Sequence, residues 1–199
     1  MIIDSEMSID EALVGTSDDC DRRILKSLEI VSVKYFSYDE EIHMGQIVIH
    51  KKLALDIEAI FALGLQLKFP IQSAIPLASK QLLDDGEWSD KLSMQLNNSS
   101  GFFHRCIAGT NRLSNHSFGV AVDINPMQNP FVRGELVLPT SGSYDPSSPG
   151  TFTATHPITT LFKELGWTWG GEWHSLKDYH HFEKPSVIPD DIMKAVAHE

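Results

Sequence analysis

Hydrophobic and polar positions along the chain predict two adjacent strands followed by an amphipathic helix. Residues 30–36 are rich in β-branched and aromatic side chains, and residues 44–49 repeat this composition after the polar stretch 37–41. Two such runs around a short polar segment are typical of a β-hairpin. Apolar residues then recur at helical spacing between residues 51 and 67, and Pro70 marks the end of this helix.

The rest of the chain predicts further short strands and few helices. Strands are expected at residues 71–77, 102–108, 119–124, 166–171 and 179–183, and helices at residues 9–13, 22–28, 160–165 and 189–198. Residues 84–100 are expected to be mostly loop, with one helical turn near residues 88–92. Strands outnumber helices, and several run in adjacent pairs. We therefore predict an α+β fold, a single domain with a central antiparallel sheet flanked by helices.

The domain organisation follows from local composition. Residues 1–28 are polar and acidic and predict an N-terminal extension, so the folded domain is expected to span residues 29–199. Residues 139–151 are rich in Ser, Pro and Gly, which predicts an exposed, mobile loop.

Composition and charge exclude several classes of function. The chain has 199 residues, of which 42% are hydrophobic, and a net charge of -11. A surface this acidic repels phosphate backbones, so nucleic acid is not an expected partner. No apolar run is long enough to span a membrane, and the first residues lack the pattern of a secretory signal. We expect a cytoplasmic protein, or one exported by a non-classical route such as phage lysis or a secretion system. Cys20 and Cys106 form no CxxC pair and are expected to be free thiols.

Two segments, residues 114–123 and 169–183, concentrate imidazoles and carboxylates that can bind a metal ion. His116 and Asp123 lie in the first segment, and His181 lies in the second. Imidazole nitrogens and carboxylate oxygens are good ligands for Zn²⁺, and a catalytic zinc site has three protein ligands and one open position. Taken alone, the spacing also allows a structural interpretation, in which His116 and Asp123 cap turns and His181 is a core histidine.

The spacing of the first two candidate ligands constrains the local backbone. Residues seven positions apart face opposite sides of a regular strand, so His116 is expected on a turn that precedes the strand carrying Asp123. Gly119 supplies the backbone freedom for such a turn.

Read together, the two segments resemble the M15 family of zinc peptidases. The pattern SxHxxGxAxD spans residues 114–123, and WGGxW followed by DxxHF spans residues 169–182. The Asn-Pro pairs at residues 125–126 and 129–130 resemble a branch of bacterial and phage members, and the similarity runs in order from about residue 28 to 185. The family contains D-Ala-D-Ala carboxypeptidases and dipeptidases, and phage endolysins that cut the L-Ala-D-Glu bond of peptidoglycan. Its fold, which Hedgehog-type domains share, is the α+β fold expected here.

The resemblance implies a ligand set and a catalytic carboxylate. It makes His116, Asp123 and His181 the ligands of Zn²⁺, and Asp178 matches the family's catalytic acid. Zinc lowers the pKa of a bound water toward about 7, and a nearby carboxylate can take its proton. Glu172 and Glu183 are the alternatives for this role. Because residues 178 and 181 alternate faces in a straight strand, a turn or bulge is expected between them.

Further site residues follow from the same resemblance. Arg105 matches an arginine that the family places near the substrate, with Arg112 as its competitor; a guanidinium holds a carboxylate or carbonyl by two hydrogen bonds. Ser114 is expected to contact substrate or a ligand, or else to cap the turn. Trp173 is expected to line the cleft. His180 is expected to face solvent or the cleft rather than bind the metal.

The expected function is a zinc-dependent peptidase that hydrolyses bonds involving D-amino acids in peptidoglycan stem peptides, as D-Ala-D-Ala carboxypeptidases do. The alternatives are an L-Ala-D-Glu endopeptidase of the endolysin type and a catalytically inactive zinc-binding module, as in Hedgehog-type domains. The partner is then a stem peptide or a small D-Ala-D-Ala-type peptide, and a monomer is expected. A metal-free hydrolase is disfavoured because the chain lacks GxSxG and any cysteine-protease signature.

Overall fold

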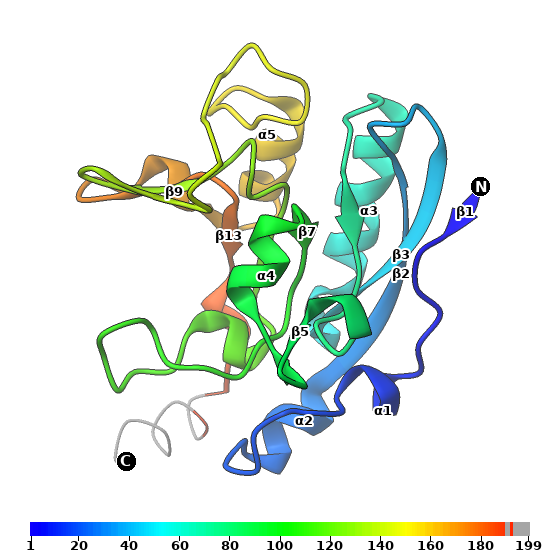
Figure 1. The fold of residues 1–199 in the computed structure, drawn as a ribbon, viewed down its shortest axis with the longest axis vertical. Helices are drawn as coiled ribbons and strands as arrows, with labels where there is room; N and C mark the ends of the chain where they lie inside the picture. The colour runs from blue at the N-terminus through cyan, green and yellow to red at the C-terminus, as the bar shows by residue number, and fades with distance from the viewer. Residues whose placement is uncertain (190–191, 193–199) are drawn as a thin grey trace.

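The N-terminal half is built on the long hairpin that the sequence predicts. In the computed structural model, which describes residues 1–189 and 192, strands β2 (Leu28–Phe36) and β3 (Ile42–His50) pair antiparallel, with Val31 opposite Ile47. The short strand β1 (Ile2–Ile3) adds to β3 in parallel, giving the order β1-β3-β2 (Figure 1). The predicted hairpin is confirmed.

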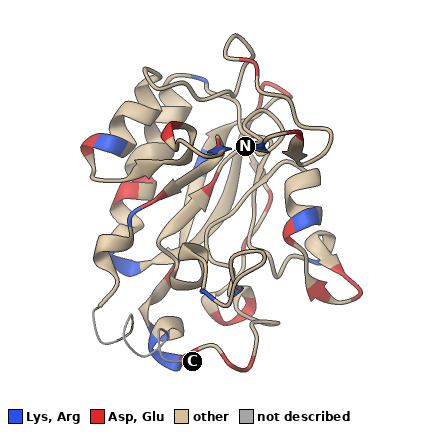
Figure 2. Cartoon of the chain, turned by 90° about the vertical axis from the view of Figure 1, so that its left-hand side faces the viewer, with Lys and Arg blue, Asp and Glu red and all other residues tan. Residues whose placement is uncertain are grey.

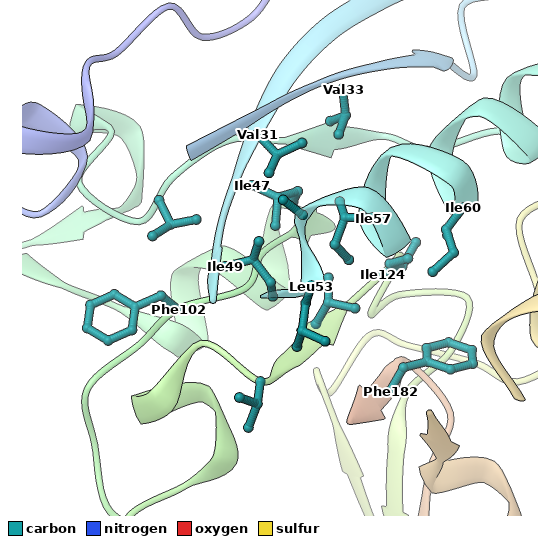
Figure 3. Close-up of a cluster of buried hydrophobic side chains, with 14 of the residues drawn as sticks. Val31, Val33, Ile47, Ile49, Leu53, Ile57, Ile60, Phe102, Ile124 and Phe182 are labelled. Atoms are coloured by element: carbon teal, nitrogen blue, oxygen red, sulfur yellow. The ribbon is translucent and has the colours of Figure 1, made fainter. Parts of the chain in front are cut away.

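The helix predicted after the hairpin covers this sheet and encloses the core. A 3-10 turn, η1 (Lys51–Leu53), leads into α3 (Ala54–Gln66), which packs against β2. Alternate strand residues and one face of α3 meet in a buried cluster, to which the second half of the chain contributes Ile124 and Phe182 (Figure 3). Residues flanking the candidate ligands are therefore anchored in the main hydrophobic core.

Short elements complete the N-terminal half. They are α1 (Ile9–Ala12), α2 (Arg22–Ser27), β4 (Ser73–Ala74), η2 (Lys80–Leu82), β5 (Leu83–Asp84), β6 (Glu87–Trp88), α4 (Asp90–Gln95) and β7 (Asn98–Ser99). Ala12 and Ile24, from α1 and α2, lie in the core cluster. Cys20 is buried, Cys106 is exposed, and both are free thiols, as expected.

The C-terminal half forms two further three-stranded sheets. Its elements are η3 (Asn115–Phe118), β8 (Ala121–Asp123), β9 (Phe131–Arg133), β10 (Leu136–Leu138), α5 (Pro157–Glu164), β11 (Thr168–Trp169), η4 (Gly170–Glu172), β12 (Lys177–Asp178), β13 (His181–Glu183) and η5 (Pro185–Val187). The strand orders are β11-β13-β8 and β10-β9-β12. The chain thus mixes helix and strand as predicted, but a single central sheet is wrong, because the strands divide among several small sheets.

Several individual predictions also differ from the structure. Residues 102–108 form no strand; their amide groups bond singly to different segments, as Phe102 does to Val48. The hairpin of β9 and β10 was not predicted, and residues 71–77 keep only the two-residue strand β4. Most of the helix expected at residues 189–198 lies outside the described residues.

The charged residues and the helices of the described chain can be seen in the structure. In the view of Figure 2, the Lys and Arg positions of the described residues are scattered among Asp and Glu positions. None of the helices within the described residues is long and apolar enough to cross a membrane.

Candidate metal centre

Cross-strand pairing brings two of the three predicted ligands together. Strands β8 and β13 run antiparallel, and Asp123 lies directly opposite His181 in their register. Directly opposed residues on one face of a sheet have neighbouring side chains. Asp123 Oδ1 and His181 Nδ1 are accordingly 2.9 Å apart, although 58 positions separate the residues in the sequence.

The third ligand comes from the turn expected before β8. His116 lies in the 3-10 turn η3, which ends at Gly119 with a φ of 63°, a left-handed conformation that favours glycine. Gly119 is also pressed against the hairpin, because a Cβ atom there would lie 2.4 Å from Leu28 Cδ2. The backbone oxygen of Gly119 accepts a hydrogen bond from His50 N at 2.8 Å. The expected turn is confirmed, and the hairpin holds it in place.

The three donor atoms converge at separations that suit a tetrahedral ion. His116 Nε2 lies 3.1 Å from His181 Nδ1 and 3.2 Å from Asp123 Oδ2. Bonds of about 2.0–2.1 Å to Zn²⁺ place neighbouring ligand atoms of a tetrahedron about 3.4 Å apart. The three residues are buried and form a group that can hold a metal ion. The observed separations require only small outward movements to reach this geometry.

Hydrogen bonds on the far side of each ring fix its tautomer. His116 Nδ1 lies 2.6 Å from the carbonyl oxygen of Gly101, and His181 Nε2 lies 2.9 Å from Glu183 Oε2. Both partners only accept hydrogen bonds, so these ring nitrogens carry the protons. When a metal ion displaces any second proton from these rings, the lone pairs of His116 Nε2 and His181 Nδ1 point at each other and at Asp123. Such a convergence of electron pairs is stabilised by a cation, so the residues present fit a bound metal.

The close approach of these buried groups shifts the pKa values of Asp123 and His181. Burial raises the pKa of Asp123, but the charges of His116 and His180 and the hydrogen bonds from His116 and His181 hold it well below its usual value. Burial lowers the pKa of His181, but its hydrogen bonds to Asp123 and Glu183 outweigh burial and raise it to about 10. The site therefore favours the charged form of Asp123, as a metal ligand requires.

Asp178 reaches the edge of this centre through the bend that the sequence requires. Strand β12 ends at Asp178, residues 179–180 form a turn, and β13 begins at His181. The predicted turn is confirmed. Asp178 Oδ1 is buried and accepts no hydrogen bond from the described residues. A buried carboxylate oxygen without a partner is costly unless a proton, a water or a substrate group completes it.

The glycines of the WGG segment allow this placement. A Cβ atom at Gly170 would lie 2.5 Å from the backbone oxygen of Asp178 and 2.9 Å from its Cβ. Only a residue without a side chain permits η4 to lie this close to Asp178. Strand β9 supports Asp178 from the other side, with Phe131 opposite it in the antiparallel register.

A comparison with known families covers this part of the chain. Residues 108–184 match the family model described as D-alanyl-D-alanine carboxypeptidase, a model of M15 peptidases. The predicted M15 resemblance is confirmed. The M15 match includes all three candidate ligands and Asp178, and it supports peptidase activity. No solved structure matches the chain.

His180 occupies a different place from the one expected. It is buried, with 4% of its surface exposed, rather than facing solvent. Its Nδ1 donates to the carbonyl oxygen of Asn129 at 2.7 Å, and its Nε2 lies 2.9 Å from Asp178 Oδ1. Burial lowers the pKa of His180, but the charges of Asp178 and Asp123 raise it to about 9. His180 therefore lies between the carboxylates of Asp178 and Asp123, which favour its protonated form.

The two alternative carboxylates point away from the three donor atoms. Glu172 is exposed and pairs with Lys163 at 2.7 Å. Glu183 accepts hydrogen bonds from His181 Nε2 and from Asn115 Nδ2, on the side of the imidazole remote from Asp123. Of the three acidic residues, Asp178 alone has a buried oxygen that accepts no hydrogen bond from the described residues, although His180 Nε2 lies 2.9 Å from it.

Arg105 is joined to the centre through its backbone. Its amide donates to Ser117 Oγ and its carbonyl accepts from the amide of Ser114, each at 3.0 Å. Its guanidinium pairs with Asp90 at 3.1 Å and lies over the ring of Phe103. Its role near a substrate stays a prediction. The competing residue, Arg112, is exposed in the turn after residue 108.

Ser114 and Trp173 border the ligands in different ways. Ser114 Oγ accepts from the amide of His116, which is the capping role that the sequence allowed. Trp173 is half-buried, with its ring centroid 5.4 Å from that of His181. It lines a groove of about 820 Å³ that also includes Trp169, His174 and Glu183. Contact of either residue with substrate remains a prediction.

The Asn-Pro pairs anchor the segment that follows β8. The side chain of Asn125 donates to the carbonyl of Pro70, and that of Asn129 donates to the carbonyl of Gly150 and accepts from Phe152 N. Both asparagines are fully buried. Most of residues 139–151 are exposed as predicted, but Tyr144 stacks on Tyr179 at 3.5 Å between ring centroids. The segment is thereby fastened beside Asp178.

Sequence reasoning missed the residues that support the ligands from behind. Gly101 and Glu183 bond the ligands His116 and His181, and Asn115 bonds Glu183. Asn129 likewise holds the neighbouring His180. One signal was present: His181 and Glu183 are two positions apart, so they share a face of the predicted strand. The carbonyl groups of Gly101 and Asn129 carry no such signal.

Proposed function

We propose that this chain is a zinc-dependent peptidase that hydrolyses peptide bonds involving D-amino acids in peptidoglycan stem peptides, in the manner of D-Ala-D-Ala carboxypeptidases. The observation that carries the proposal is the buried group of His116, Asp123 and His181, whose donor atoms converge, together with the buried carboxylate of Asp178 three residues before His181. The M15 match over residues 108–184 supports the reaction class.

Different residues of the chain would bind the metal, transfer the proton and compensate charge during hydrolysis. His116, Asp123 and His181 would hold the zinc ion, which supplies a Lewis acid that polarises the scissile carbonyl and acidifies water. Asp178 takes a proton from the attacking water at Oδ1 as the new C–O bond forms. It then passes that proton to the amine nitrogen as the C–N bond breaks. His180 balances the charge of Asp178 from within the core.

The wide groove beside Trp173 supports a second candidate, an L-Ala-D-Glu endopeptidase. A carboxypeptidase needs a closed pocket for a free C-terminal carboxylate, whereas an endopeptidase needs a groove through which the chain passes. The open groove of about 820 Å³ borders Glu183, the hydrogen-bonding partner of His181, and we take it as support for the endopeptidase. The guanidinium of Arg105 is paired with Asp90 in this structure.

The deciding experiment is an incubation with purified peptidoglycan and, separately, with D-Ala-D-Ala. Products are identified by mass spectrometry, before and after a chelator and after restoration with Zn²⁺. Release of D-Ala supports the carboxypeptidase, and new L-Ala and D-Glu ends support the endopeptidase. Wild-type protein that binds zinc but releases no product under either condition would favour the inactive zinc-binding module.

A further inference from the structure

Glu183 lies directly behind one of the candidate ligands and is tied to the turn that carries another. Its Oε2 atom accepts a hydrogen bond from His181 Nε2 at 2.9 Å and a second one from Asn115 Nδ2 at 2.7 Å. Asn115 is the first residue of η3 and precedes the ligand His116. One carboxylate oxygen therefore connects β13 to η3, the two elements that supply the histidines.

We infer that Glu183, held by Asn115, is a positioning residue that orients His181 and sets the affinity of the centre for its metal. This inference rests on the proposed zinc centre. It assigns to Glu183 a role other than general base, because the imidazole ring separates its carboxylate from Asp123 and from the converging lone pairs.

The geometry explains how Glu183 acts through His181. A carboxylate accepts but does not donate, so it keeps the proton of His181 on Nε2 and leaves the lone pair of Nδ1 free for the metal. It also makes the imidazole a stronger ligand, since negative charge behind the ring increases its basicity. The side chain of Glu183 is only 20% exposed, so water replaces this contact poorly.

The two histidines differ in how their outer partners can be altered. The partner of His116 is the backbone carbonyl of Gly101, which no side-chain substitution removes. The partner of His181 is a side chain. Metal affinity can therefore be adjusted at Glu183 without replacing a ligand, and Asn115 should contribute a smaller part by fixing the rotamer of Glu183.

The test compares the zinc affinity of four variants of the full chain with that of the wild type, by competition with a chromophoric chelator. Glu183→Ala should weaken zinc binding by about 10- to 100-fold, the usual effect of removing an outer partner. Glu183→Gln keeps an acceptor but loses the charge, so its loss should be smaller. The zinc affinity of Asn115→Ala should lie between those of Glu183→Gln and the wild type. Glu172→Gln is the matched control for affinity, because Glu172 pairs with Lys163 and touches no ligand.

A second measurement separates positioning from general stability. Long-range ¹H–¹⁵N NMR spectra of the imidazoles report which nitrogen of His181 carries the proton. The wild type should show protonation at Nε2, and Glu183→Ala should show a mixture, while Glu183→Gln restores the Nε2 form. A purely structural role would change the melting temperature and leave both the tautomer and the order of zinc affinities unchanged.

Each outcome bears on the inference in a distinct way. Wild-type zinc affinity and an unchanged tautomer in Glu183→Ala would overturn it while leaving the proposed function intact. If Glu183→Ala does not fold, the other two variants decide. The inference would be overturned if Glu183→Gln and Asn115→Ala both bound zinc as tightly as the wild type does. A wild type that binds no zinc would overturn the proposed function itself, before any variant is compared.

Discussion

Replacing Gly170 with alanine should displace the proton-accepting carboxylate while leaving the metal ligands in place. The backbone of Gly170 does not adopt a left-handed conformation, so the only obstacle to a methyl group is the contact with Asp178. The added carbon would lie 2.5 Å from the backbone oxygen of Asp178, whereas ordinary contacts begin at 3.4 Å. The two segments must therefore separate by about 0.9 Å.

A displacement of this size has a predictable effect on the rate. A misplacement of about 1 Å can cost about 100-fold in catalysis, equivalent to about 2.7 kcal/mol of transition-state stabilisation. We expect Gly170→Ala to lower kcat/KM about 100-fold on whichever substrate the product analysis identifies, with zinc content unchanged. The control is Gly64→Ala in α3, where the new carbon would lie 3.6 Å from Ile158 Cδ1, an ordinary contact, and activity should be retained.

A double-mutant comparison shows whether the effect passes through Asp178. If it does, adding Gly170→Ala to Asp178→Ala should cause no further loss of activity. Full activity in Gly170→Ala would refute the reasoning. So would an equal further loss in the Asp178→Ala background, or a loss of zinc in proportion to the loss of rate.

Three other predictions follow from the described contacts. Asp178→Asn should retain zinc, measured by elemental analysis, but lose hydrolysis by about 100-fold or more, since the amide cannot accept the proton; retained activity would contradict the assignment. His116→Ala and His181→Ala should each lower zinc content and the zinc-dependent rise in melting temperature together, because a ligand contributes binding energy to the folded state; unchanged stoichiometry would show that the ligand set is wrong. Burial lowers the pKa of His43, but hydrogen bonds with Asp39 and Asp4 outweigh burial and raise it. The protonated His43 therefore stabilises the fold fully below about pH 6.5, and this stabilisation is lost as pH rises through the folded-state pKa. The difference in melting temperature between the wild type and His43→Gln should therefore shrink from pH 6 to pH 8, and a constant difference would contradict this link.

The sequence predicts the elements whose partners are close along the chain. The hairpin of β2 and β3 follows from alternating side chains around one short turn, and α3 follows from helical spacing that ends before Pro70. The small sheets were not predictable in this way. Strands β8 and β13 are three residues each and pair across almost 60 positions, so neither contains enough residues to show a period.

The same distinction applies to the candidate site, where local spacing was predictive and tertiary packing was not. The spacing of His116 and Asp123 required a turn with Gly119, and the spacing of Asp178 and His181 required a bend; both are present. The ligand set itself came from the M15 resemblance. The outer partners were not predictable, because the carbonyl groups of Gly101 and Asn129 belong to segments whose position depends on tertiary packing.

The buried side chains of Asn125 and Asn129 separate a fixed part of the chain from an exposed part, residues 133–136. Their amide groups tie both ends of the excursion between β8 and α5 to the protein interior, while the tip of the β9–β10 hairpin, around Gly134, touches nothing that a methyl group would disturb. We expect residues beside Gly134 to tolerate exchange without moving Asn125 or Asn129, whereas Gly134 itself, with a φ of 60°, should stay glycine.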